Sequence, residues 1–244
     1  MSNKTKKTIE EKIKDRTVLE NFIKEKEWSE LIDAKDLIGA LNGDSPSQKF
    51  SQILGNPGCY KWWAREDDVK DLLCKIIGNN VDFDQLKGTF EHEEGTDFYC
   101  IYVGKADCLR DRLKHHAKHL FQSTLRRTIF SLYCPEEKKL EDINRCVDDT
   151  LGDFKVKFFS LDKEKWKKAG KNPYKLEDLN FSILDLEYYF INEKFHILNV
   201  DENVYAEYNN LDANCADKTK EIVNALKDKK WSKKRIQKKL ANKT

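Results

Sequence analysis

Two kinds of hydrophobic spacing run along the chain and predict a mixture of strands and helices. Aromatic and aliphatic residues stand side by side at 59–64 and 98–103 and alternate with lysine at 154–158, which is typical of strands. Spacings of three and four predict helices at 8–40, in two stretches of which the second begins near Trp28, and at 67–77, 107–120, 123–132 and 182–195. Two further short helices are predicted from 215 onward. Three strands among many helices predict the α+β class.

Turn and capping residues set the limits of several of these elements. The runs 42–46 (Asn-Gly-Asp-Ser-Pro) and 56–58 (Asn-Pro-Gly) are typical of loops. Ser123 stands where a helix cap is expected, and Ser182 with Asp185 has the spacing of a capping box. These signals predict where two of the helices begin.

Composition and cysteine usage narrow the class of protein. Charged residues make up 36% of the chain and aromatic residues 11%, which favours a folded protein with a highly charged surface. No apolar run is long enough to span a bilayer, and no secretory signal is visible, so we expect a cytoplasmic protein with no membrane partner. The 7 cysteines include no Cys-x-x-Cys pair, which favours reduced and mostly buried thiols.

Positive charge gathers in two islands although the net charge is only +2. Residues 226–244 hold 9 Lys and Arg against a single Asp, and residues 105–127 hold 7 against 2 acidic residues, with 3 histidines among them. Such islands suggest a surface that binds a polyanion. For the C-terminal island, a solvated lysine-rich helix explains the pattern equally well.

Glu187 is the most informative single position. Its neighbours three and four positions away on the predicted helix are Ile183, Leu184, Phe190 and Ile191, so the carboxylate interrupts an apolar stripe. A carboxylate there is costly to bury unless it binds a metal ion or pairs with a basic side chain. The residues alone leave both interpretations open and do not name a partner.

A second group of polar residues follows the strand at 98–103. Gly104 ends that strand, Lys105 follows it, and Arg112 and His116 share one face of the next helix. A phosphate could approach Lys105 and the guanidinium group together. An ordinary amphipathic helix with a solvated Arg and His is the alternative.

Taken in order, these segments resemble the GIY-YIG nuclease superfamily over about residues 56–209. The two family tripeptides match residues 58–60 (Gly-Cys-Tyr) and 102–104 (Tyr-Val-Gly). Arg112 falls 10 residues after the second Tyr, His116 follows 4 later, and Asn199 lies 12 residues after Glu187, as in the family pattern. Three features depart from the pattern: Cys59 replaces an apolar residue, His196 replaces a frequent Pro, and the two tyrosines stand 42 positions apart.

The resemblance implies a fold, an activity and a set of roles. It implies a small three-stranded antiparallel sheet flanked by helices, and hydrolysis of DNA phosphodiester bonds with one divalent cation, Mg²⁺ or Mn²⁺. Glu187 would bind the metal, Arg112 would neutralise charge on the phosphate, and Tyr60 would be the general base. Tyr102 and His116 complete the implied catalytic set, with His116 either assisting Tyr60 or contacting phosphate.

The remaining residues receive supporting roles. Gly58, Gly104 and Asn199 are predicted to support the site structurally, with Asn199 anchoring the helix of Glu187. Contacts with nucleic acid are predicted for two basic groups: Lys105, Arg126 and Arg127, and Lys233, Lys234 and Arg235.

The division of the chain follows from the same resemblance. We expect a helical N-terminal region at 1–55, the nuclease-like domain at 56–210 with an insertion at about 65–97, and a basic helical tail at 211–244. The substrate is expected to be double-stranded DNA, and a restriction or defence enzyme that cuts both strands of a palindrome would act as a homodimer. The alternatives are a binding module that does not cut and a nuclease that acts on RNA or single strands.

Overall fold

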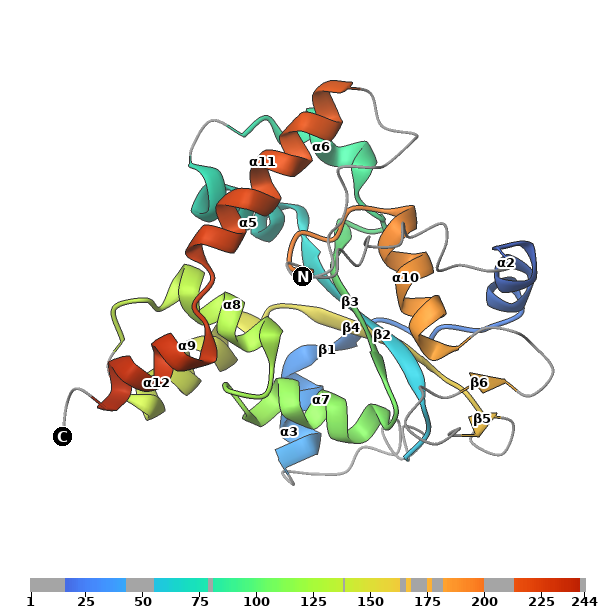
Figure 1. Cartoon of the computed structure of the whole chain (residues 1–244), viewed down its shortest axis with the longest axis horizontal. Helices are drawn as coiled ribbons and strands as arrows, with labels where there is room; N and C mark the ends of the chain where they lie inside the picture. Colours follow the sequence, from blue (N-terminus) through green and yellow to red (C-terminus); the bar gives the residue numbers. More distant parts are fainter. Residues whose placement is uncertain are drawn as a thin grey trace, which may run out of the picture.

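The computed structural model describes residues 16–42, 55–78, 81–137, 139–162, 166–167, 175–176, 182–199 and 213–241. Its central sheet is antiparallel, with the strand order β1-β4-β2-β3 (Figure 1). The strands are β1 (Ile32–Asp33), β2 (Gly58–Arg65), β3 (Phe98–Ala106) and β4 (Lys155–Ser160). The α+β class and the three predicted strands are confirmed, and β1 adds a short fourth strand at one edge.

Helices surround this sheet, and they make up most of the other elements of the described residues. A separate pair of short strands, β5 (Trp166–Lys167) and β6 (Lys175–Leu176), lies outside the main sheet. The helices are α2 (Arg16–Lys24), α3 (Ala34–Asn42), α5 (Glu66–Ile77), α6 (Phe83–Leu86), the 3-10 helix η1 (Lys87–Thr89), α7 (Leu109–Lys118), α8 (Thr124–Tyr133), α9 (Leu140–Gly152), α10 (Ile183–Glu193), α11 (Ala213–Lys229) and α12 (Lys233–Ala241).

Each face of the sheet is covered by a different set of helices, because successive side chains of a strand point to opposite faces. Cys59 and Val103 pack against α10 in one hydrophobic core, which also holds Leu19 of α2. Tyr60 and Trp62 belong to the larger core on the other face, with α7, α5, α8, α9 and α11. Figure 1 shows α10 and α7 on either side of the β2–β3 pair. The alternation of β2 therefore sends neighbouring residues toward different helices.

The predicted helix starts agree with the structure at two caps. Ser123 caps α8 by accepting a hydrogen bond from the backbone amide of Arg126. Ser182 and Asp185 form the predicted capping box at the start of α10. Among the described residues, no helix has both the length and the apolar character that crossing a membrane requires.

The N-terminal prediction is wrong in part. The two predicted stretches correspond to α2 and α3, but α3 begins at Ala34 and not near Trp28, and residues 8–15 lie outside the described residues. The residues between α2 and α3 are not helical because their side chains and backbone pack against and pair with the sheet. Trp28 packs edge-on against Phe159 with ring centroids 4.7 Å apart, and Ile32 pairs with Val156 of β4.

The cysteine prediction also needs correction. Cys134 and Cys146 form a disulfide that joins the end of α8 to α9, so the thiols are not all reduced. The other five cysteines are not part of a disulfide. The pairing depends on α9, which was not among the predicted helices and whose buried face holds Ile143, Val147 and Leu151.

Candidate active site

The first tyrosine is held by the pairing of β2 with β3. Tyr60 stands opposite Gly104, and its ring lies across that glycine. A Cβ atom at position 104 would come within 2.4 Å of the Tyr60 hydroxyl oxygen and 2.5 Å of Cζ. Glycine at 104 therefore makes room for the phenol ring, which is a steric requirement and not one of backbone conformation.

Gly58 fills an equally tight place at the start of β2. A Cβ atom there would lie 2.2 Å from the carbonyl oxygen of Phe159 and 2.6 Å from Cδ1 of Leu109. The close approach lets the start of β2 pack against both β4 and α7. Both glycines that were predicted to support the site thus lie where a side chain would collide.

The Tyr60 hydroxyl joins two side chains of α7. It accepts a hydrogen bond from Nε of Arg112 at 3.1 Å and lies 2.8 Å from Nε2 of His116. Because Arg112 can only donate, the single phenolic hydrogen is available for the His116 nitrogen. The other ring nitrogen, Nδ1, lies 2.7 Å from Oγ of Ser123. This chain of contacts favours the His116 tautomer that is protonated on Nδ1.

Burial sets the protonation states of Tyr60 and His116. Burial, followed by the charge of Tyr102, raises the pKa of Tyr60 well above 10, although Arg112 opposes the shift. Burial, with Arg112 and Arg126, lowers the pKa of His116 well below 6.5. At neutral pH the site therefore holds a neutral phenol hydrogen-bonded to a neutral imidazole.

Glu187 approaches this group from the other face of the sheet. It is only 8% exposed, and its Oε1 accepts a hydrogen bond from the backbone amide of Lys105 at 3.1 Å. Its charge raises the pKa values of both Tyr60 and Arg112, after larger effects at each group. The carboxylate is therefore close enough to both groups to influence them, although 75 residues of sequence separate it from Arg112.

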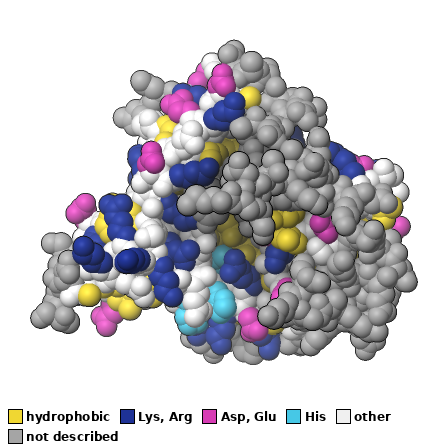
Figure 2. All heavy atoms as spheres, in the orientation of Figure 1, with side chains coloured by type: hydrophobic (Ala, Val, Ile, Leu, Met, Phe, Trp, Pro, Cys, Tyr) yellow, Lys and Arg dark blue, Asp and Glu magenta, His cyan; other side chains and the backbone are white. Residues whose placement is uncertain are grey.

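A cavity of about 450 Å³ opens where these elements meet. Glu187 lies on its wall with Lys105, Arg112 and His115, and its other lining residues are Ala106, Asp107, Cys108 and Asp111. Figure 2 shows histidine side chains beside Lys and Arg over α7. The structure thus places a carboxylate and a guanidinium group on one solvent-accessible wall, while Tyr60, fully buried, lies behind Arg112.

Tyr102 and Asn199 occupy supporting positions beside the cavity. The Tyr102 ring lies 6.2 Å from the Tyr60 ring and 5.8 Å from the His116 ring, measured between centroids. The Asn199 side chain makes two hydrogen bonds to the backbone of Val103, accepting at 2.8 Å and donating at 2.7 Å. Asn199 thereby ties the segment that follows α10 to the strand that leads into Gly104 and Lys105.

The prediction that Arg126 contacts nucleic acid is wrong. Its side chain is fully buried, and Nη1 donates to the carbonyl oxygens of His116 and Ala117 and pairs with Asp148 at 2.6 Å. Arg126 therefore satisfies the last carbonyls of α7 and holds α7, α8 and α9 together. A cation in a basic run was taken for a surface charge, although it forms part of the protein interior.

The other predicted nucleic-acid contacts have different surroundings. Arg127 is half-buried and donates to the carbonyl oxygen of Phe121 and to Oγ1 of Thr124. The three basic residues near the start of α12 are exposed and lie outside the lining of the cavity: Lys233, Lys234 and Arg235. Only Lys105 of the predicted phosphate contacts lines the cavity itself.

Sequence reasoning missed several residues of the site. Ser123 was predicted only as a helix cap, yet it also contacts His116. Asp111 and His115 line the cavity, and their spacing of four places them on one face of α7. That spacing, read together with Arg112, was the available signal.

A small antiparallel sheet places Glu187 and Arg112 on the wall of one polar cavity, with the Tyr60–His116 pair behind Arg112, which is an arrangement suited to hydrolysis of a phosphate ester. The comparison with known families agrees with this class. A family model described as the GIY-YIG catalytic domain matches residues 58–222, more than half of the chain. The protein therefore belongs to the GIY-YIG family, whose catalytic domain is that of nucleases. No curated protein and no solved structure matches the chain.

Proposed function

We propose that this protein is a divalent-metal-dependent endonuclease that hydrolyses phosphodiester bonds of double-stranded DNA, as a restriction or defence enzyme. One observation carries the proposal above all: Glu187 and Arg112 line one cavity, and the buried Tyr60–His116 pair lies directly behind Arg112. Arg112 connects the two parts, because it lines the cavity and also donates to Tyr60.

The donor set on the cavity wall suits a hard cation. Mg²⁺ binds oxygen ligands, keeps several waters and needs only one or two protein carboxylates beside the substrate phosphate. Glu187 supplies a carboxylate, with Asp107 and Asp111 on the same wall. A bound Mg²⁺ or Mn²⁺ would supply positive charge against the scissile phosphate and the leaving oxygen.

Tyr60 and His116 supply a route for the proton of the attacking water. A buried phenol with a raised pKa is a poor base by itself. It can accept a proton from water if its own proton passes to Nε2 of His116 in the same step, and that atom lies 2.8 Å away. Ser123 then holds the ring through Nδ1. His116 thus assists Tyr60 in this proposal, because both ring nitrogens are engaged and the ring is fully buried.

Arg112 has two tasks in the proposed reaction. Its Nε donates to the Tyr60 oxygen and so favours the phenolate as the proton leaves. The rest of the guanidinium group faces the cavity and would neutralise the nonbridging oxygens as charge builds on the phosphate. Tyr102, whose ring lies beside those of Tyr60 and His116, would help to orient the water.

Basic residues on the surface would bind the rest of the substrate. Lys105 at the cavity and the exposed Lys233, Lys234 and Arg235 of α12 would contact the DNA backbone. Contacts of this kind position the duplex but carry no sequence information. For cleavage of both strands of a palindrome, the enzyme would act as a homodimer.

A substrate panel tests the proposal. Supercoiled plasmid, single-stranded DNA and RNA are incubated with the protein in Mg²⁺ and in EDTA, and Arg112→Gln controls for contaminating nucleases. We expect Mg²⁺-dependent cuts in the plasmid by the wild type alone. Binding without cleavage of any substrate would contradict the enzymatic proposal, and cleavage confined to RNA or to single strands would contradict the proposed substrate.

A further inference from the structure

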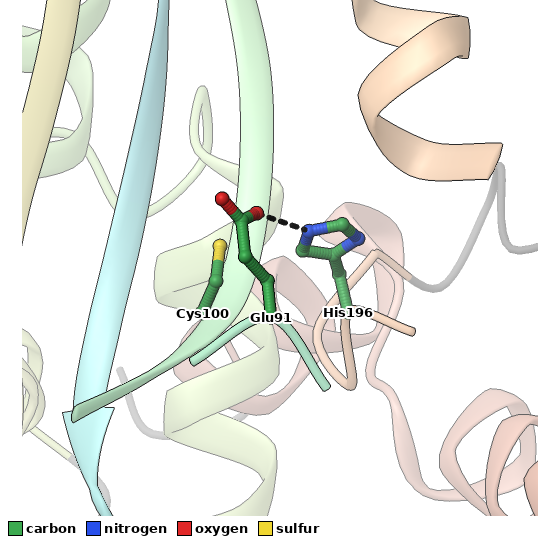
Figure 3. Close-up of side chains that lie close together, drawn as sticks. All are labelled: Glu91, Cys100 and His196. Carbon is green, nitrogen blue, oxygen red and sulfur yellow. Dashed lines mark ion pairs between the residues drawn. The ribbon is translucent and has the colours of Figure 1, made fainter. Parts of the chain in front are cut away.

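A second polar cluster lies on the side of β3 away from Tyr60. Glu91 comes from the segment between η1 and β3, Cys100 from β3, and His196 from the turn after α10. Their ligand atoms all lie within 4.8 Å of one another (Figure 3). Cys100 and His196 are fully buried, and the Glu91 side chain is 30% exposed. Three segments far apart in sequence thus bring a thiol, an imidazole and a carboxylate to one place.

The spacing and the chemistry of these groups suit a transition metal. Nε2 of His196 lies 3.7 Å from Oε2 of Glu91, which is long for a hydrogen bond. Metal–ligand distances of about 2.0–2.1 Å in a tetrahedral zinc site put a nitrogen and an oxygen ligand roughly 3.3 Å apart. Only a small movement separates the two arrangements. Sulfur and imidazole ligands also favour zinc over magnesium.

The protonation states of the three side chains agree with a role as metal ligands. Burial lowers the pKa of His196, although Glu91 opposes the shift, so the ring is neutral as a ligand must be. Burial opposes ionisation of Glu91, but Lys61 and His196 together lower its pKa to about 2. The Cys100 thiol, whose pKa burial raises well above 9, would release its proton to solvent when the metal binds.

Lys61 forms an ion pair with the Glu91 carboxylate, and a metal at this site must leave room for it. Its Nζ lies 2.5 Å and 2.7 Å from the two carboxylate oxygens, and 4.5 Å from the ring centroids of Trp28 and Phe190. Ligating carboxylates are commonly hydrogen-bonded through their second oxygen. Lys61 can therefore keep Oε1 while Oε2, the oxygen nearer His196, binds the metal.

We propose that Glu91, Cys100 and His196 bind one zinc ion, with a water molecule from the exposed side of Glu91 as the fourth ligand. The ion would fasten the turn after α10 to β3, close to Asn199 and its bonds to Val103. The site is separate from the cavity of Glu187 and does not depend on the proposed nuclease activity. A buried Lys61–Glu91 ion pair without metal is the competing explanation.

Metal analysis of the full chain tests the proposal. The protein is produced with zinc in the medium, purified with a reductant, and its bound metal is measured by mass spectrometry. We expect about one zinc per chain in the wild type and in two controls, Cys74→Ser and Glu187→Gln, and less than about a tenth of that in Cys100→Ser and His196→Gln. Retention in Glu187→Gln separates this site from the proposed catalytic one.

Cobalt replacement gives a second readout, and its first measurement uses the wild-type protein alone. Wild-type protein stripped of metal and loaded with Co²⁺ should show a thiolate-to-cobalt charge-transfer band in the near ultraviolet. Cys74→Ser should keep that band and Cys100→Ser should lose it. Wild-type protein that holds no zinc and shows no band, or a band that survives in Cys100→Ser, would overturn the proposal in favour of the ion pair.

Discussion

Replacing Gly104 with alanine perturbs the site without removing any polar group. The new Cβ would lie 2.4 Å from the Tyr60 hydroxyl oxygen and 2.5 Å from Cζ, whereas nonbonded carbon contacts lie at about 3.5–4.0 Å. The ring must therefore withdraw by about 1 Å. That shift would break the 3.1 Å contact with Arg112 and the 2.8 Å contact with His116.

The expected cost has a structural part and a catalytic part. Overpacking of this kind destabilises proteins by about 1–3 kcal/mol. A catalytic group misplaced by about 1 Å costs on the order of 100-fold in rate. We therefore expect Gly104→Ala to stay folded at 25 °C, to bind DNA as the wild type does, and to cleave it about 100-fold more slowly.

Single-turnover cleavage and urea unfolding measure the two parts separately. Gly39→Ala is the matched control, because a Cβ at that position in α3 meets no heavy atom within 4 Å. The control should cleave at the wild-type rate and be no less stable. Wild-type cleavage and wild-type stability in Gly104→Ala would refute the claim that the Tyr60 ring rests on this glycine.

Three further predictions concern other parts of the structure. The pKa of His116 is lower in the folded state than in the unfolded chain, so the unfolded chain binds more protons as the pH falls through about 6.5. The free energy of unfolding should therefore decrease as the pH falls from 7 to 5, and it should depend less on pH in His116→Asn. Reduction of the Cys134–Cys146 bridge, which closes a short loop, should cost about 3 kcal/mol and leave a Cys134→Ser/Cys146→Ser variant unchanged. Lys233→Ala/Lys234→Ala should weaken DNA binding evenly across sequences and reduce the salt slope by about 2, and an unchanged slope would remove α12 from the interface.

The local signals in the sequence predicted much of the fold. Runs of aromatic and aliphatic residues predicted β2 and β3, alternation predicted β4, and the capping box of Ser182 and Asp185 marked the start of α10 correctly. The short strand β1 was not predicted, because two residues are too few to show a period. Trp28 and Ile32 have helical spacing, but Trp28 packs against Phe159 and Ile32 pairs with β4, because tertiary packing overrides local propensity.

Local spacing predicted the candidate site only where a single element carries it, and the family resemblance supplied Tyr60 and Glu187 from other elements. Arg112 and His116 lie on one face of α7 at a spacing of four, and that face was visible in the sequence. The burial of Arg126 was not, because its partners are backbone carbonyls of α7 and a carboxylate of α9. The cluster of Glu91, Cys100 and His196 likewise depends on three segments meeting in space, which no local spacing records.

Glu187→Gln tests whether Glu187 binds the catalytic cation at the cavity that it shares with Arg112. Gln keeps the size of the side chain and an oxygen that can accept from the amide of Lys105, but it loses the negative charge. Cleavage of a duplex in Mg²⁺ is measured beside binding of the same duplex in EDTA. We expect cleavage to fall by at least about 1,000-fold while binding changes less than about twofold. Cleavage at the wild-type rate would contradict this role of Glu187.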